Sequence, residues 1–301
     1  MHSQAQLVKS LNSNICSTGG IGIMNARIFD IPPETNLLSS SAFAKIQAFF
    51  QQQSGILIAE HKQQLIVTRL RSHMLSLGFK EFDSYATYLI NTASPTERTH
   101  VVDLLTTNET YFFREPEHFN HLANLMLPSI QHRPLRMWCA AASSGEEPYS
   151  LAMALNEKLG ANGWELTASD ISVRMLETAH HGLYRMQRLE HMPAEYLRKY
   201  CRRGTGPYEG MFMVDPDVRK QVNFVQHNLL DSAANLGQFD IVFVRNVMIY
   251  FDSDVKTKVL RNLYAQLRPG GWLVTSHSES LIGLDSPLKL VRASIYRKPQ
   301  A

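Results

Sequence analysis

The residues best suited to chemistry are an acid, two amides and a guanidinium that end three apolar segments. Asp170 ends one segment, Asn228 follows the next, and Arg245 with Asn246 ends the third. An aspartate so placed accepts hydrogen bonds from both hydroxyls of a ribose, and an amide can meet an adenine edge. Arg245 and Asn246 would lie beside the reaction centre. An adenosine-containing ligand fits all four, although Asp170 could instead cap the following helix.

The stretch Leu135–Leu155 predicts a cradle for such a ligand. It reads as a buried strand, a turn of small residues and an amphipathic helix. Gly145 permits a sharp turn, and Pro148 suits the first turn of a helix. Such a unit places backbone N–H groups and the positive end of a helix at the carboxyl edge of a sheet. An ordinary strand-to-helix connection is the alternative, because the three-glycine dinucleotide fingerprint is missing.

Acidic residues at the start of that helix indicate which adenosine compound fits. Glu146 and Glu147 would repel a pyrophosphate, and the turn carries neither a P-loop lysine nor an arginine. The two acids tolerate a cationic ligand, and S-adenosylmethionine carries an ammonium and a sulfonium. Its carboxylate needs a positive partner, for which Arg114 is the candidate. The sequence therefore favours a methyl donor over ATP or a dinucleotide.

Strand and helix patterns alternate from residue 135 onward and predict an α/β fold with a doubly wound, mostly parallel, Rossmann-like sheet. We assign residues 135–301 to this domain. An antiparallel β subdomain is expected to interrupt it at about residues 205–225. There, Met211–Val214 and Val222–Val225 read as the two strands of a hairpin.

Helical periodicity predicts a separate, small all-α domain at residues 39–105. Its second helix carries Lys62, Arg69 and His73 along one basic stripe, which we expect to be exposed. A solvated helix face without any partner would show the same stripe.

Two further segments flank the helical domain. Residues 1–38 lack sustained periodicity and are predicted to be a mobile extension. Residues 106–134 are predicted to be a linker that contributes to the ligand site, because Thr106–Phe119 contains a polar cluster. Asn108 or Thr107 could equally be a helix cap, with the neighbouring aromatic side chains in the core.

Composition excludes several classes of protein. Of 301 residues, 44% are hydrophobic and 19% charged, and no apolar run approaches the roughly 20 residues needed to cross a bilayer. A net charge of +3 is too small to indicate bulk binding of nucleic acid. Cys16, Cys139 and Cys201 lack metal-ligand spacing, so no metal site is predicted. With no signal-peptide pattern, we expect a cytoplasmic protein without membrane insertion.

Five motifs occur in the order found in a known family: TTNETYFFRE, AAASSGEEPYS, ASDIS, NLLD and RNVMIYFD. Together they resemble the chemotaxis protein methyltransferases over about Phe43–Arg297. The resemblance implies a class I methyltransferase domain that transfers methyl from S-adenosylmethionine to receptor glutamates for sensory adaptation, leaving methyl esters and S-adenosylhomocysteine. It implies a donor site lined by Asn108, Thr110, Arg114, Glu147, Asp170, Asn228, Leu229, Arg245 and Asn246. Tyr250 would lie near the transferring methyl. Arg114 and Tyr250 are the predicted catalytic residues, because both would align the reactants.

The resemblance also implies how a methyl-accepting chemotaxis receptor is bound. In that family a basic helix of the small domain meets the receptor. Lys62, Arg69 and His73 would thus face the acidic cytoplasmic methylation helices, with His73 in place of a permanent cation. In some members the β subdomain tethers the receptor's C-terminal pentapeptide. The turn GTGPYEG resembles theirs, so a peptide could add to the edge of the Met211–Val225 hairpin.

Transfer to glutamate depends on alignment more than on a base, because the carboxylate is already ionised near neutral pH. Two rival functions compete with this interpretation. A nucleic-acid methyltransferase would need a base-stacking motif of the Asn-Pro-Pro-Tyr kind, where RNVMIY stands instead. A catalytically silent S-adenosylmethionine-binding regulatory protein is the second alternative. A monomer is the default expectation.

Overall fold

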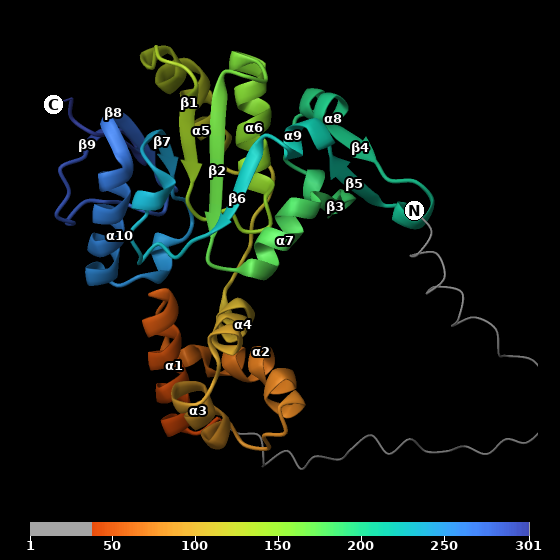
Figure 1. Ribbon diagram of the computed structural model, residues 1–301, viewed down its shortest axis with the longest axis vertical. Coiled ribbons are helices and arrows are strands. Elements are labelled where there is room, and N and C mark those ends of the chain that lie inside the picture. Colours follow the sequence, from red (N-terminus) through yellow and green to blue (C-terminus); the bar gives the residue numbers. More distant parts are fainter. Residues whose placement is uncertain (1–37, 301) are drawn as a thin grey trace, which may run out of the picture. The chain divides into compact units, whose positions relative to one another are not determined.

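A seven-stranded sheet has the strand order β6-β2-β1-β7-β8-β10-β9 (Figure 1). The computed structural model describes residues 38–300. The first five strands in that order run parallel, and β10 and β9 join antiparallel. The bounds are β1 Leu135–Cys139, β2 Trp164–Asp170, β6 Val222–Gln226, β7 Phe239–Phe243, β8 Leu267–Val274, β9 Lys289–Arg292 and β10 Ile295–Arg297.

Helices cover both faces of this sheet because its central strands are apolar on both sides. Met137 and Cys139 of β1 belong to the core that includes α6 (Glu146–Leu159) and α7 (Val173–His181). The intervening Trp138 belongs to the opposite core, where α10 (Ser253–Gln266) packs. The predicted doubly wound α/β fold is confirmed.

Four helices form the N-terminal part around a core of their own. Ser39 caps the first by accepting the Ala42 N–H at 3.0 Å, and Ser94 caps the fourth by accepting the Glu97 N–H at 3.1 Å. The predicted all-α domain is confirmed. The helices are α1 Ser40–Ser54, α2 Gln63–Ser76, α3 Phe82–Asn91 and α4 Pro95–Leu105. A short α5 (Pro116–His121) follows before the sheet begins.

A separate antiparallel sheet is present, but the predicted hairpin is wrong. Its strands are β3 (Leu183–Arg185), β5 (Met211–Val214) and β4 (Cys201–Arg203), with β5 in the middle. The second predicted hairpin strand is β6, which pairs with β2 in the large sheet. Helix α9 (Pro216–Arg219), capped by Asp215, separates β5 from β6, so no tight turn returns the chain beside β5.

The expected mobile extension, residues 1–38, lies outside the described residues apart from Leu38. Within residues 38–300, no helix combines the length and apolar character that a membrane crossing requires. All described residues belong to one compact unit.

Candidate functional site

A cavity that is partly open to solvent lies beyond the carboxyl ends of β1, β2, β6 and β7. Parallel strands bring such ends to one edge of a sheet, where ligands of α/β proteins bind. All ten residues predicted for the donor site line it: Asn108, Thr110, Arg114, Glu147, Asp170, Asn228, Leu229, Arg245, Asn246 and Tyr250. The structure therefore brings them together, and the part that each plays in binding stays a prediction.

Asp170 closes the cradle between β1 and α6. Its Oδ2 accepts the Ser143 N–H at 2.7 Å and its Oδ1 accepts the Ser172 N–H at 2.9 Å. Burial raises the pKa of Asp170, and these two backbone N–H groups counter part of that rise. A carboxylate offers about four lone-pair sites, so it retains capacity to accept from a ligand. Ser172 caps α7 with its hydroxyl, which separates the capping role from Asp170.

Gly145 gives the cradle its shape. Its φ of +100° lies in the region that only glycine adopts readily. A Cβ there would lie 2.8 Å from both the Ala179 Cβ and the Tyr184 hydroxyl oxygen. The backbone can therefore turn this tightly into α6 only without a side chain.

Arg245 is a fully buried cation at the floor of the cavity. Its guanidinium pairs with Glu147 and with Glu115 Oε2 at 3.0 Å, and it donates to the Arg114 carbonyl at 2.6 Å. The Cys139 thiol donates to the other Glu147 oxygen at 3.3 Å. The neighbouring carboxylates raise the pKa of Arg245 despite its burial. Arg245 therefore holds the Glu147 side chain and the backbone carbonyl of Arg114 in place.

Arg114 itself is only partly buried. Within the described part of the chain its side chain makes one hydrogen bond, from Nη1 to the Glu109 carbonyl at 3.1 Å. Its guanidinium lies 5.4 Å from the centre of the Tyr111 ring. Asn108 is held through its carbonyl, which accepts the Ser143 hydroxyl at 3.1 Å. Among the predicted residues, Arg114 is thus the cation better placed to meet an anionic ligand group.

The amide of Asn228 already has two partners. Its Nδ2 donates to the Gln53 carbonyl at 2.8 Å, and its Oδ1 accepts the Leu230 N–H at 3.0 Å. One N–H and one lone pair of the amide remain for a ligand. Asn228 therefore also ties the end of α1 to the large sheet, a role that the sequence did not predict.

The loop after β7 positions Asn246 and Tyr250. Asn246 has φ +58°, and Glu279 accepts its N–H at 2.9 Å and the Ile249 N–H at 3.2 Å. The Tyr250 carbonyl accepts the Leu57 N–H at 3.1 Å. Two contacts therefore fix this loop. The buried Glu279 binds its backbone N–H groups, and the Leu57 N–H binds its carbonyl at Tyr250.

Sequence reasoning missed three contributors to this site. Ser54 and residues 56–58 line the cavity at the end of α1, and only the apolar character of residues 56–58 could have suggested it. The sequence around Glu279 carries no motif that indicates a role in this site, apart from its position after the last parallel strand. His227 lines the cavity next to Asn228, and its Nε2 is buried without a hydrogen-bond partner among the described residues. Burial lowers the pKa of His227, which favours the neutral ring.

Comparison with known proteins identifies the family. Residues 108–297 match the description "CheR methyltransferase, SAM binding domain", and residues 41–106 match "CheR methyltransferase, all-alpha domain". The chain belongs to the CheR methyltransferase family. It is 41% identical over 258 residues to chemotaxis protein methyltransferase 2 of Pseudomonas aeruginosa, covering 84% of this chain and 91% of that protein. Over 262 residues it is 39% identical to the chemotaxis protein methyltransferase of Salmonella typhimurium, covering 86% and 90%.

The cavity of this CheR family member fits S-adenosylmethionine. Asp170 could supply a partly buried acceptor for a ribose, Glu147 an anionic group for an ammonium, and Arg114 a cation for a carboxylate. The absence of a phosphate-binding lysine in the cradle agrees with that ligand. The predicted cofactor is therefore supported by both the chemistry of the lining and the family.

The predicted basic stripe on α2 is only partly exposed. Lys62 is exposed and lines the cavity. Arg69 donates to the carbonyls of Leu105 and Thr106 at 2.6 and 2.8 Å. The expectation of exposure is wrong for His73, whose side chain is 11% exposed and pairs with Glu97 at 2.6 Å. Spacing alone did not reveal that α4 packs against this face of α2.

Proposed function

We propose that this chain is a protein-glutamate O-methyltransferase that methylates glutamate side chains of methyl-accepting chemotaxis receptors. The observation that carries the proposal is the gathering, in one cavity, of ten residues from five separate sequence motifs. Family membership supports methyl transfer in chemotaxis. The finer specificity, for a carboxylate, rests on the cavity chemistry that follows.

Each polar part of the donor has a complementary partner in this cavity. Asp170 accepts the ribose hydroxyls, and Glu147 faces the ammonium. Arg114 binds the carboxylate, because Arg245 is already committed to two acids. Asn228 contributes its remaining amide N–H to the adenine. The neighbouring His227 also lines the cavity, and its Nε2 has no hydrogen-bond partner within residues 38–300.

The chemistry needs no general base. When bound, S-adenosylmethionine supplies a methyl group carried on a sulfonium. A glutamate side chain is already a carboxylate near pH 7, so this chain has only to align it and exclude water. Alignment can supply about 7–11 kcal/mol, whereas a general base contributes roughly 10²–10⁴-fold. Tyr250 lines the cavity. Because the reaction needs no general base, we assign Tyr250 to the alignment of the glutamate.

An exposed cation that lines the cavity favours an acidic protein substrate. This residue, Lys62, directly precedes α2. Arg69 and His73, which were predicted to bind the receptor, would support this contact only indirectly. The Arg69 side chain binds the backbone at Thr106, and His73 joins α2 to α4 through Glu97. Receptor methylation helices rich in acid would therefore meet Lys62 first.

A second receptor contact is proposed at the small sheet. Since β5 is its middle strand, a peptide cannot add there, and the open edges belong to β3 and β4. Strand β4 carries the exposed Arg202 and Arg203, which suits the carboxylate of a chain terminus. Calorimetry with a peptide of the receptor's own C-terminal five residues tests this contact. Unchanged binding in an Arg203→Ala variant would place the peptide elsewhere.

The proposed function is tested by transfer of radiolabelled methyl from S-adenosylmethionine to membranes that contain the host's chemoreceptors. Alkaline release of the label as methanol identifies a carboxyl ester and is the expected result. Donor binding without labelling of any receptor would instead favour the catalytically silent regulatory protein. We place the reaction in the cytoplasm, on the receptors' methylation helices, and expect sedimentation to give the mass of a monomer.

A further inference from the structure

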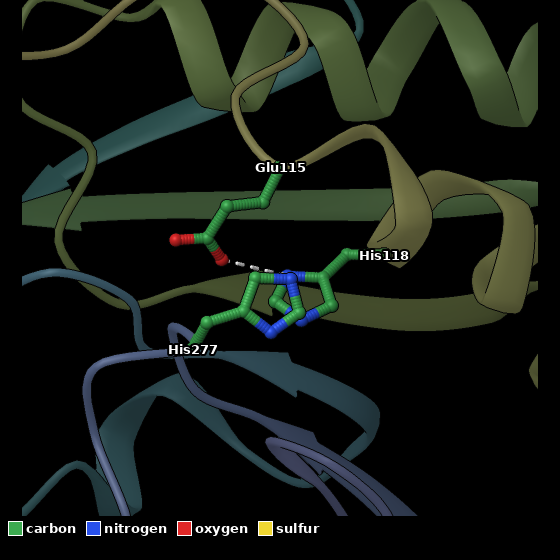
Figure 2. A group of neighbouring side chains, drawn as sticks. All are labelled: Glu115, His118 and His277. Atoms are coloured by element: carbon green, nitrogen blue, oxygen red, sulfur yellow. Dashed lines mark ion pairs between the residues drawn. The ribbon is translucent and has the colours of Figure 1, made fainter.

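Three side chains outside the donor cavity lie close together, as Figure 2 shows: Glu115, His118 and His277. One potential ligand atom of each lies within 4.8 Å of the others. Glu115 precedes α5, His118 lies within α5, and His277 follows β8. Tertiary structure therefore assembles this group from distant parts of the sequence.

The tautomer of His118 follows from its neighbour Ser294. The Ser294 hydroxyl donates to the Ala293 carbonyl at 2.6 Å, so its oxygen accepts from His118 Nε2 at 2.7 Å. With its hydrogen on Nε2, the neutral ring carries a lone pair on Nδ1. His118 is fully buried, and that Nδ1 has no hydrogen-bond partner among the described residues.

The Nδ1 lone pair points at a second acceptor. Glu115 Oε2, which is likewise buried, lies 3.2 Å from it. Two acceptors in contact repel unless a cation lies between them. The nearby Arg245 pairs with Glu115 Oε2 at 3.0 Å but is shared with Glu147.

We propose that Glu115, His118 and His277 form a binding site for a divalent transition-metal ion of the Zn²⁺ class. Two imidazoles and one carboxylate are a donor set typical of Zn²⁺ with a fourth position left for water, whereas Mg²⁺ and Ca²⁺ prefer oxygen alone. The bond from His118 Nε2 to Ser294 is the outer contact that orients a metal-binding histidine.

Access and charge agree with this assignment. The His277 side chain is 43% exposed, so an ion reaches the group from solvent. Glu117 Oε2 lies 3.9 Å from His277 Nε2 and adds a negative charge at the entrance.

The test uses the full chain without a histidine tag, stripped of metal and kept reduced. Zn²⁺ is titrated by calorimetry, and Co²⁺ by its visible absorption, which reports coordination number. We expect one equivalent of each ion to bind. His277→Ala should weaken binding at least about tenfold, since even outer-shell changes cost 10–100-fold. His181→Ala, at an exposed histidine of α7, is the matched control and should leave binding unchanged.

His277→Cys gives a second readout without disturbing the buried His118. A cysteine thiolate at the site should add a sulfur-to-Co²⁺ charge-transfer band in the near ultraviolet that the parent chain lacks. Substoichiometric binding by the parent overturns the proposal. So does equal loss in His277→Ala and His181→Ala, or a His277→Cys spectrum identical to that of the parent.

Discussion

Replacing Arg245 by methionine should destabilise the protein strongly. The Arg245 side chain is 0% exposed, and its removal leaves the buried Glu147 and the partly buried Glu115 without their shared cation. Methionine nearly fills the volume, so the loss is electrostatic. Breaking a buried pair by removing one partner costs about 3–5 kcal/mol. At about 2–4 °C per kcal/mol, the Tm should fall by about 6–20 °C in thermal unfolding followed by circular dichroism.

A double-mutant cycle separates this charge effect from lost packing. Glu147→Gln removes one stranded charge, so Arg245→Met/Glu147→Gln should be more stable than the sum of the two single changes predicts, by about 0.5–3 kcal/mol. Arg261→Met is the control, because its pair with Asp285 at 3.6 Å is exposed and worth about 0–1 kcal/mol. Strict additivity, or a Tm for Arg245→Met no lower than that of Arg261→Met, would refute the reasoning.

Three further predictions concern the donor and receptor sites. Tyr250→Phe should lower kcat at least about tenfold with the donor Kd unchanged, and a raised Kd at normal kcat would contradict its alignment role. Asp170→Asn should weaken donor binding in calorimetry by roughly 10–150-fold, because hydrogen bonds to charged groups are worth about 1.5–3 kcal/mol; Asp217→Asn, whose side chain is 88% exposed, should not. Lys62→Ala should raise the KM for receptor at low salt, whereas the equally exposed Lys80→Ala should leave it unchanged.

Much of the fold was predictable because apolar periodicity is a local property. Strands β1 and β7 are buried on both faces, and their continuous apolar runs predicted a parallel sheet covered on two sides. The small sheet was not predictable in the same way. Strand β6 has the composition of a hairpin partner for β5, but its alternate buried residues Val222 and Phe224 pack in the large sheet. Which strand pairs with which depends on tertiary contacts that no local pattern records.

The residues of the candidate site likewise fall into those that local patterns predict and those that only tertiary contacts bring together. Asp170, Asn228 and Arg245 were placed correctly at one edge because parallel strands always present their carboxyl ends together. Glu279 and residues 56–58 could not be predicted, since their contacts join segments separated by long stretches of sequence. Arg245 was expected beside the reaction centre, yet its bonds make it a support for Glu147 and Arg114.

Residues 106–115 present ordered ligand-binding groups although they lie outside helices and strands, and their bonds explain how. Successive backbone groups are held by different elements: carbonyls 106, 108, 110 and 114 accept from the side chains of residues 69, 143, 188 and 245. The N–H of Phe113 donates to the Ser150 hydroxyl at 3.0 Å. Phe113 and Glu115 keep φ values of +54° and +56°, a strain of order 1–3 kcal/mol each that only such surroundings sustain. The segment that carries Arg114 is thus rigid because three arginines and two serines from elsewhere in the fold bind its backbone.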